Sequence, residues 1–237
     1  MYEHVDLVAA GDQRLRDMPA DEARPPVTIS RKASYPRPRM FITFEGLDGS
    51  GKSTQTELLA EAIRGMGREV VTTREPGGTA LGEQVRALLL TGDGIAPWAE
   101  AALFAAARAE LVELVIAPAL ERGAVVICDR YLDSSLAYQG GARGLGVEQV
   151  LQLNLPAISG RLPDRTFLLE IDPDESARRV GQNGDRIERE DGRFRRQVAD
   201  AYRLLAETFP QRIEAVDGSR PAAEIAKEIF GRVRESL

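Results

Sequence analysis

The residues with the clearest chemical signature lie between 46 and 53, where the chain reads Gly-Leu-Asp-Gly-Ser-Gly-Lys-Ser. This run fits the pattern G-x-x-x-x-G-K-[ST], whose glycines let successive backbone N–H groups point at phosphate oxygens. In this pattern the ammonium of Lys52 neutralises the β- and γ-phosphates, and the hydroxyl of Ser53 ligates Mg²⁺. The sequence therefore predicts an ATP-binding loop made of Gly46, Leu47, Asp48, Gly49, Ser50, Gly51, Lys52, Ser53 and Thr54.

Lysine usage supports a functional role for Lys52. The chain holds three lysines, Lys32, Lys52 and Lys227, and otherwise uses arginine for positive charge. A lysine at this point of the loop supplies a compact point charge. The alternative interpretation is a Gly-rich turn with an incidental lysine, but an apolar run precedes the loop and an amphipathic run follows it.

A second candidate magnesium ligand is Asp129, which follows the apolar run 125–128. An aspartate at the end of a strand can hold a water on Mg²⁺ beside a phosphate loop. The pattern is weak by itself, because many strands end in Asp, and it gains weight from the loop. The sequence therefore predicts Mg²⁺, bound through Ser53 and Asp129 together with ATP, as the cofactor.

Short apolar runs alternate with helical patterns from Met40 onward. Strands are expected at 40–44, 69–73, 124–128, 166–171 and 212–216, and helices at 52–66, 80–90, 98–121, 147–158, 173–180, 192–208 and 221–235. Such alternation indicates a parallel sheet covered on both faces, with ligands beyond the carboxyl ends of the strands. The sequence therefore predicts an α/β protein, a three-layer P-loop NTPase fold with a five-stranded parallel sheet flanked by helices.

Residues 1–39 have a different composition from the rest of the chain. They are polar and contain several prolines, which oppose a long helix. We expect a flexible arm at 1–39, with a short helix near 4–10, ahead of one domain at 40–237. The alternative is that translation starts at Met40.

Composition excludes several functional classes. The net charge of −6 and the pI of about 5.1 argue against broad nucleic-acid binding. One cysteine, Cys128, and one histidine, His4, leave no disulfide within the chain and no Cys/His metal site. No apolar run approaches the ~20 residues of a membrane span, and no signal-peptide pattern is visible. We expect a cytoplasmic protein without nucleic-acid or membrane partners.

Several arginines stand where a second phosphorylated ligand could be bound. Arg74 follows the second expected strand and Arg130 follows the third, and guanidinium groups bind phosphate through a planar fork. Arg108 comes four residues after Phe104, so both lie on one face of the expected helix 98–121. The alternatives are core packing for Phe104, and for Arg108 a solvated face or an ion pair with Glu100 or Glu110.

Five segments carry a resemblance to a known family. They are FEGLDGSGKST at 44–54, TREPGGT at 73–79, DRY at 129–131, AYQGG at 137–141 and DRIE at 185–188. In this order and spacing the chain resembles the bacterial thymidylate kinases over about residues 40–235. The resemblance implies a nucleoside monophosphate kinase domain at 40–237 that phosphorylates dTMP to dTDP with ATP, a step of dTTP biosynthesis.

The resemblance also implies roles for single residues. Arg74 and Arg130 would hold the acceptor phosphate. Phe104 would stack on thymine, and Arg108 would hydrogen-bond the edge of the pyrimidine.

Further implied roles concern the base, the sugar and the metal. Ser135 and Gln139 would contact the base, and Tyr138 would lie against the deoxyribose and disfavour a 2′-hydroxyl. Asp48 would lie near the acceptor phosphate and the metal.

A short lid is expected at about 178–191. The loop 46–53 contains no arginine, so charge in the transition state is expected to be met from the lid, with Arg179 and Arg186 preferred over Arg178. The expected catalytic residues are thus Lys52, Asp48, Arg179 and Arg186. The sequence departs from the family at 180–184, which is neutral, and these arginines could instead form an exposed helix face paired with Glu175 or Glu188.

Two other functions stay open at this point. One is a P-loop kinase for another nucleoside monophosphate, and the other is a P-loop regulatory ATPase; a GTPase is disfavoured because no lysine follows an asparagine as in N-K-x-D. The expected partners are ATP and dTMP. A homodimer through helix 98–121 is possible, although burial within the monomer explains that apolar helix equally well.

Overall fold

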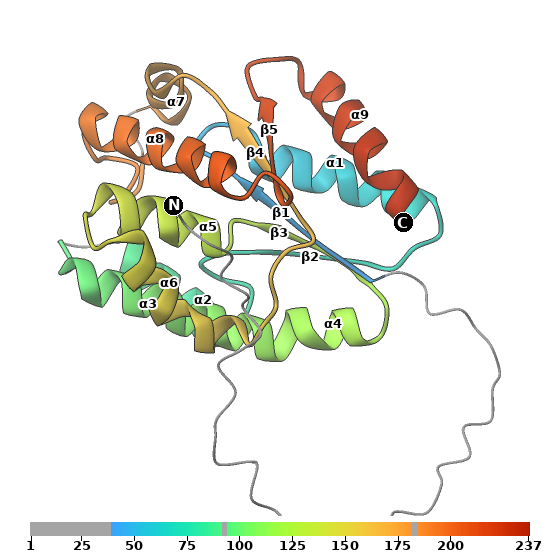
Figure 1. Ribbon diagram of the computed structural model, residues 1–237, viewed down its shortest axis with the longest axis horizontal. Coiled ribbons are helices and arrows are strands. Elements are labelled where there is room, and N and C mark those ends of the chain that lie inside the picture. Colours follow the sequence, from blue (N-terminus) through green and yellow to red (C-terminus); the bar gives the residue numbers. More distant parts are fainter. Residues whose placement is uncertain (1–38, 92–93, 182–183) are drawn as a thin grey trace, which may run out of the picture. The chain divides into compact units, whose positions relative to one another are not determined.

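A computed structural model describes residues 39–91, 94–181 and 184–237. Apart from Arg39, the expected arm at 1–39 and its short helix therefore lie outside the described residues. The strands form one parallel sheet in the order β2-β3-β1-β4-β5 (Figure 1). Their bounds are β1 Met40–Glu45, β2 Val70–Arg74, β3 Val125–Asp129, β4 Arg165–Glu170 and β5 Ile213–Asp217.

This sheet confirms the predicted fold class, with strand ends that differ by about one residue. Arg74 and Asp129 are the last residues of β2 and β3, rather than residues that follow them. The register pairs Arg74 with Asp129, and Asp129 with Phe44 of β1. The carboxyl ends of three adjacent strands therefore meet at one edge, where the sequence places the loop and two charged side chains.

Helices cover both faces of the sheet (Figure 1). They are α1 Lys52–Gly65, α2 Ala80–Leu90, α3 Pro97–Leu111, α4 Ala117–Glu121, α5 Leu132–Ser135, α6 Val147–Ile158, α7 Pro173–Val180, α8 Gly192–Thr208 and α9 Ala222–Val233. None of the helices in the described ranges is long and apolar enough to cross a membrane.

Side chains alternate along each strand between two cores. Ile42 and Val125 point to the face covered by α1 and α9. Phe41 and Val126 point to the other face, where they join residues of α6 and α8. Period-two alternation of apolar side chains on both faces is the pattern of a sheet buried between two helical layers.

The expected helix 98–121 is interrupted by a π-helical turn at Val112–Ile116. Pro118 lacks the N–H that would bond to the carbonyl of Leu114, so a regular ladder cannot continue through this point. A widened turn is one way in which a helix absorbs such a defect. The segment thus forms α3, the π turn and α4 in succession.

A helical segment at 132–142 was not expected from the sequence. Residues 132–142 form α5 and a π-helical turn at Leu136–Ala142, although Gly140 and Gly141 suggest a loop. A Cβ on Gly141 would lie 2.7 Å from the Cβ of Ala201 in α8, so this glycine serves close helix packing. It permits α8 to approach the turn that carries Tyr138 and Gln139.

The central core should depend strongly on Phe167. This side chain is fully buried in β4, with its ring centroid 5.8 Å from that of Phe44. We expect Phe167→Ala to lower the free energy of unfolding by about 3–5 kcal/mol, measured by urea denaturation, because it leaves a cavity. Leu204→Ala on α8, where the leucine is 59% exposed, is the control and should change it by under ~0.5 kcal/mol. Equal effects of the two substitutions would contradict this account.

Candidate active site

The glycine-rich loop connects β1 to α1 and turns sharply at Gly46. A Cβ on Gly46 would lie 2.4 Å from the carbonyl oxygen of Leu169, so no larger residue fits there. Helix α1 begins at Lys52 without a side-chain cap. The N–H groups of its first turn are therefore available to an anion, and the positive end of the helix dipole favours one.

Lys52 is the buried cation of this loop. Its Nζ donates to the carbonyl oxygen of Leu47 at 2.8 Å. Burial, and after it the charge of Arg130, lowers the pKa of Lys52 from 10.5 to about 8, against the opposing effect of Asp48 and Asp129. An ammonium whose charge is destabilised in this way gains from an added anion, as a phosphate would supply.

The two predicted magnesium residues lie together at the start of α1 and the end of β3. The hydroxyl of Ser53 donates to Oδ2 of Asp129 at 2.5 Å. Within the part of the chain that the structure describes, no cluster of three or more His, Cys, Asp or Glu side chains could hold a metal. This donor set suits Mg²⁺, which commonly takes one or two protein oxygens and completes its shell with phosphate oxygens and water.

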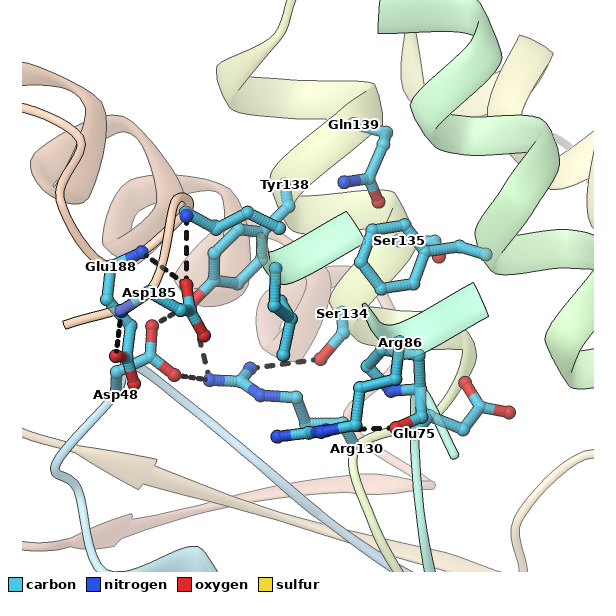
Figure 2. A pocket seen from close by; sticks show the side chains of 14 residues that line it. Asp48, Glu75, Arg86, Arg130, Ser134, Ser135, Tyr138, Gln139, Asp185 and Glu188 are labelled. Carbon is cyan, nitrogen blue, oxygen red and sulfur yellow. Dashed lines mark hydrogen bonds and ion pairs between the residues drawn. The ribbon is translucent and has the colours of Figure 1, made fainter. Parts of the chain in front are cut away.

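Arg130 lies between the loop and the rest of the site. Its φ of 68° is in the left-handed region, and its backbone N–H donates to the carbonyl oxygen of Phe44 at 2.9 Å. The guanidinium pairs with Asp48 and donates to the hydroxyl of Ser134 at 3.1 Å (Figure 2). It also donates to the hydroxyl of Tyr202 at 3.2 Å. A strained conformation fixed by this many contacts is typical of functional positions.

Asp48 is the loop residue that faces Arg130. Burial alone would raise the pKa of its carboxyl, but Arg130 and Lys52 together hold the pKa below its usual value. The side chain therefore remains ionised at neutral pH. It also accepts a hydrogen bond from the hydroxyl of Tyr138 at 3.2 Å.

Glu45 forms a buried support under Arg130 that sequence reasoning missed. Its carboxylate accepts from the backbone N–H of Tyr131 (2.8 Å) and from the hydroxyls of Ser134 (2.6 Å) and Tyr202 (2.9 Å). Burial, with the charge of Asp133 second, raises the pKa of Glu45 to about 7. A signal was present, since Glu45, like Asp129, ends an apolar strand beside the loop.

A pocket opens next to Arg130, and we call it the aromatic pocket (Figure 2). It is lined by Asp48, Glu75, Pro76, Arg86, Leu90, Phe104, Arg130, Ser134, Ser135, Tyr138, Gln139, Asp185, Ile187 and Glu188. Most of the residues predicted to bind the acceptor nucleotide are thus brought together. They come from α3, from the segment 130–142 and from the loop after β1.

A neighbouring space, the loop cavity, contains the phosphate loop. It is lined by Asp48, Gly49, Gly51, Lys52, Ser53, Thr54, Arg74, Glu75, Arg86, Asp129, Arg130 and Glu188. Arg74 lies here rather than in the aromatic pocket, and its exposed guanidinium pairs with Glu83 at 3.2 Å.

Three residues that line both spaces were not predicted as site residues from the sequence, namely Glu75, Arg86 and Glu188. Arg86 donates to the carbonyl oxygen of Pro76 at 2.9 Å, and Glu188 accepts from the backbone N–H of Asp185 at 2.8 Å. Burial first, and then the nearby charges of Asp185 and Asp48, raise the pKa of Glu188. The DRIE segment contained the signal for Glu188, whereas Arg86 stands outside every motif.

Arg108 lies beneath the aromatic pocket and does not line it. Only 1% exposed, it donates to Glu75 (2.6 Å), to the carbonyl oxygen of Tyr131 (3.0 Å) and to the hydroxyl of Ser135 (3.1 Å). Its ionic partner is thus Glu75, and neither Glu100 nor Glu110. A direct contact of Arg108 with a pyrimidine edge stays a prediction.

The two arginines preferred for the lid occupy different places. Arg179 of α7 donates to the carbonyl oxygen of Gly49 (3.1 Å) and to Glu175 (2.8 Å), so it lies against the phosphate loop. Arg186 instead donates to the carbonyl oxygen of Leu89 (2.8 Å) and to Glu100 (2.6 Å), away from the loop.

The other arginines of the expected lid, Arg178 and Arg189, bond to neighbours within about five residues along the chain. Arg178 is exposed and pairs with Glu175 at 2.6 Å, as the alternative interpretation of a charge-paired helix face has it. Residues 182–183, within the neutral stretch of the lid, lie outside the described residues.

Comparison with known proteins decides the family. The family model described as thymidylate kinase matches residues 44–229. The chain belongs to the thymidylate kinase family. The thymidylate kinase of Leifsonia xyli is 53% identical over 201 residues, which are 83% of this chain and 95% of the relative.

Other members of the family agree with this assignment. The thymidylate kinase of Pelotomaculum thermopropionicum is 48% identical over 203 residues, covering 83% of this chain and 94% of the relative. The crystal structure of thymidylate kinase from Ehrlichia chaffeensis superimposes with a TM-score of 0.67 at 36% identity, over 82% of this chain and 98% of that chain. The family resemblance inferred from the five motifs is therefore confirmed.

The lowered pKa of Lys52 predicts a cost to stability with a defined pH dependence. Between pH 8 and 10.5 the unfolded chain binds this proton and the folded chain does not, so stability rises with pH there. Below pH 8 Lys52 is protonated in both states, and its buried charge lowers the free energy of unfolding by the full amount, roughly 3 kcal/mol. We expect Lys52→Met to be more stable than the native protein at pH 7 by about 1–3 kcal/mol, allowing for the lost hydrogen bond.

The measurement is urea denaturation at pH 7 and at pH 10, where the stability gain should shrink. Lys227→Met on α9, where the lysine is exposed, is the matched control and should change little at either pH. A Lys52→Met protein that is less stable at pH 7, or a gain that grows with pH, would refute the assignment.

Proposed function

We propose that this protein is a thymidylate kinase, which transfers the γ-phosphoryl group of ATP to dTMP and releases ADP and dTDP. The observation that carries the proposal is the junction of the two spaces. Asp48, Arg130, Arg86, Glu75 and Glu188 line both the loop cavity and the aromatic pocket. A triphosphate on the loop and a nucleotide in the pocket would therefore direct their phosphates at the same point.

The donor side of the reaction is assigned to the phosphate loop. The N–H groups at the start of α1 and the ammonium of Lys52 would bind the phosphates of ATP. Ser53 and Asp129 would hold Mg²⁺, which bridges and neutralises phosphate oxygens when bound. The other residues of the loop, from Gly46 to Thr54, shape this site.

The acceptor phosphate is assigned to arginines. Arg130 offers a buried guanidinium that already pairs with a carboxylate, Asp48, and a phosphate can be bound in the same bidentate manner. Arg74 and Arg86 line the loop cavity beside it. A phosphate monoester has a second pKa of ~6, so the nucleophile is largely ionised at neutral pH and needs no catalytic base.

The base and the sugar are assigned to the aromatic pocket. Phe104 offers a ring for stacking, and Ser135 and Gln139 offer polar groups. The Nε2 of Gln139 donates to Glu100 at 3.0 Å, which leaves Oε1 to accept a hydrogen bond from the N3–H of thymine. Tyr138, whose hydroxyl is held by Asp48, would lie against the deoxyribose.

Charge in the transition state is assigned to Lys52 and the lid. Arg179 is the better placed lid residue, because it already contacts the phosphate loop. For Arg186 to act there, its contacts with Leu89 and Glu100 would have to break. Alignment of two anions and neutralisation of spreading charge are sufficient for phosphoryl transfer.

The homodimer and the cytoplasmic location also stay predictions. In the described residues, Ala101, Ala105 and Leu111 of α3 are buried within the monomer, whereas Trp98 is 50% exposed. The apolar character of α3 is thus largely explained by its own core.

The acceptor is tested with a panel of nucleoside monophosphates. ADP formation is measured with ATP, Mg²⁺ and each of dTMP, dUMP, UMP, CMP, AMP and GMP. We expect dTMP to give the highest kcat/KM and ATP consumption without an acceptor to be negligible. Lys52→Ala should lower turnover by at least a hundredfold with the fold retained, because it removes charge stabilisation at the transferred phosphoryl group.

Other results of this panel point to the alternatives. A preference for another monophosphate would assign a different acceptor, and ATP consumption that no acceptor changes would indicate a regulatory ATPase. Near-normal turnover of Lys52→Ala would remove the loop from the catalytic site.

The ring of Phe104 provides a test of the acceptor pocket. We expect Phe104→Ala to raise the KM for dTMP by about tenfold, since stacking on a base contributes ~1–3 kcal/mol, and to leave the KM for ATP within twofold. Steady-state kinetics with each substrate varied in turn gives both values. Equal rises in the two KM values would mean that Phe104 serves only core packing.

A further inference from the structure

The carboxylate of Glu100 is an unexplained charge behind the aromatic pocket. Glu100 lies in the first turn of α3, four residues before Phe104, and is 1% exposed. Its Oε1 accepts from Nε2 of Gln139 (3.0 Å) and Nε of Arg143 (3.2 Å), and its Oε2 accepts from Arg186 (2.6 Å). Neither the phosphate loop nor the acceptor phosphate requires this group.

The contact with Gln139 has a chemical consequence. An ionised carboxylate only accepts hydrogen bonds, so the amide of Gln139 must turn its NH₂ group toward Glu100. Gln139 is 2% exposed and lines the aromatic pocket. Its carbonyl oxygen is therefore the amide atom presented to a base in the pocket.

We propose that Glu100 is a positioning residue that sets base specificity by fixing the orientation of the Gln139 amide. This inference rests on the proposed function. With its carbonyl toward the ligand, Gln139 accepts from the N3–H of thymine or uracil. Cytosine has an unprotonated N3, which would face the same oxygen with two acceptors opposed, and such unmatched polar groups are costly in a buried site.

The surroundings of Glu100 keep its carboxylate ionised. Arg143 and Arg186 both bond to the carboxylate of Glu100. Arg143 also pairs with Glu190 at 2.6 Å, and Arg186 also donates to the carbonyl oxygen of Leu89. Although burial opposes ionisation, the hydrogen bonds from Gln139, Arg186 and Arg143 hold the pKa of Glu100 below its usual value. A permanent acceptor next to Gln139 is what a fixed amide orientation requires.

The test compares two substrates that differ only at the edge that Gln139 would read, namely dTMP and 5-methyl-dCMP. In Glu100→Gln the new amide can donate or accept, so the Gln139 amide is free to turn over. We expect the ratio of kcat/KM for dTMP to that for 5-methyl-dCMP to fall by about tenfold or more. The ratio cancels any effect common to both substrates, such as a change in stability or in the contact with Arg186.

The matched control is Glu113→Gln, which neutralises an exposed carboxylate just after α3. It should leave the ratio within twofold of the native value. An unchanged ratio in Glu100→Gln, with kcat/KM lowered equally for both substrates, would overturn the proposal, because a purely structural role predicts that result.

A second variant covers a failure to fold. If Glu100→Gln shows no cooperative thermal transition, the same pair is measured with Glu100→Asp, which keeps the charge near the two arginines and withdraws it from Gln139. We again expect the ratio of kcat/KM for dTMP to that for 5-methyl-dCMP to fall, and a ratio equal to that of the native enzyme would overturn the proposal. A failure of the proposed function is seen separately, in a native enzyme that does not phosphorylate dTMP.

Discussion

The ion pair between Arg130 and Asp48 is the contact on which the rest of the site depends. Its two members come from different strands, since Asp48 follows β1 and Arg130 follows β3. A buried guanidinium is costly unless it is paired and hydrogen-bonded. Pairing therefore fixes the phosphate loop relative to the aromatic pocket before any ligand binds. Without this ion pair, the distance between the donor and acceptor nucleotides of the proposed reaction would depend on a flexible loop and on the long side chain of an unpaired arginine.

The sheet order makes this pairing possible. Strand β1 lies between β3 and β4, so the segments that follow β1 and β3 leave the sheet side by side. Glu45, at the end of β1, then bonds to Tyr131, Ser134 and Tyr202, the last of them on α8. One carboxylate thus links the strand, the segment after β3 and a helix far away in the sequence. In this arrangement the hydroxyls of Ser134 and Tyr202 and the carboxylate of Glu45, which lie under Arg130, all have hydrogen-bond partners.

What could be predicted from the sequence was local in origin. The phosphate loop, the strand ending at Asp129 and the alternation of strands and helices each rest on a short pattern, and the motifs identified the family. The ion partner of Arg108 could not be found in this way. Neighbours on a helix, Glu100 and Glu110, were considered, whereas the partner is Glu75, which follows β2 and meets Arg108 only through the folding of the whole sheet. The positions of Arg86 and Arg186 likewise follow from packing between elements. The helical segment 132–142 was not predicted, because the packing of Gly141 against α8 is not visible in the sequence.

The balance of charge at the junction explains why this site suits phosphates with a metal ion. Asp48 and Glu188 line both spaces, and Asp185 lies beside them in the aromatic pocket (Figure 2). In the proposed reaction, two nucleotides would bring several further negative charges to the same place. Lys52, Arg130, Arg86 and Arg74 offset part of this total, and a divalent cation at Ser53 and Asp129 would offset more. The carboxylates also weaken the binding of other anions to the arginines, because an incoming anion has to displace or join an existing ion pair. Under the proposed function, selectivity for a ligand with both a phosphate and a base would follow from geometry, since Arg130 and the ring of Phe104 line the same pocket.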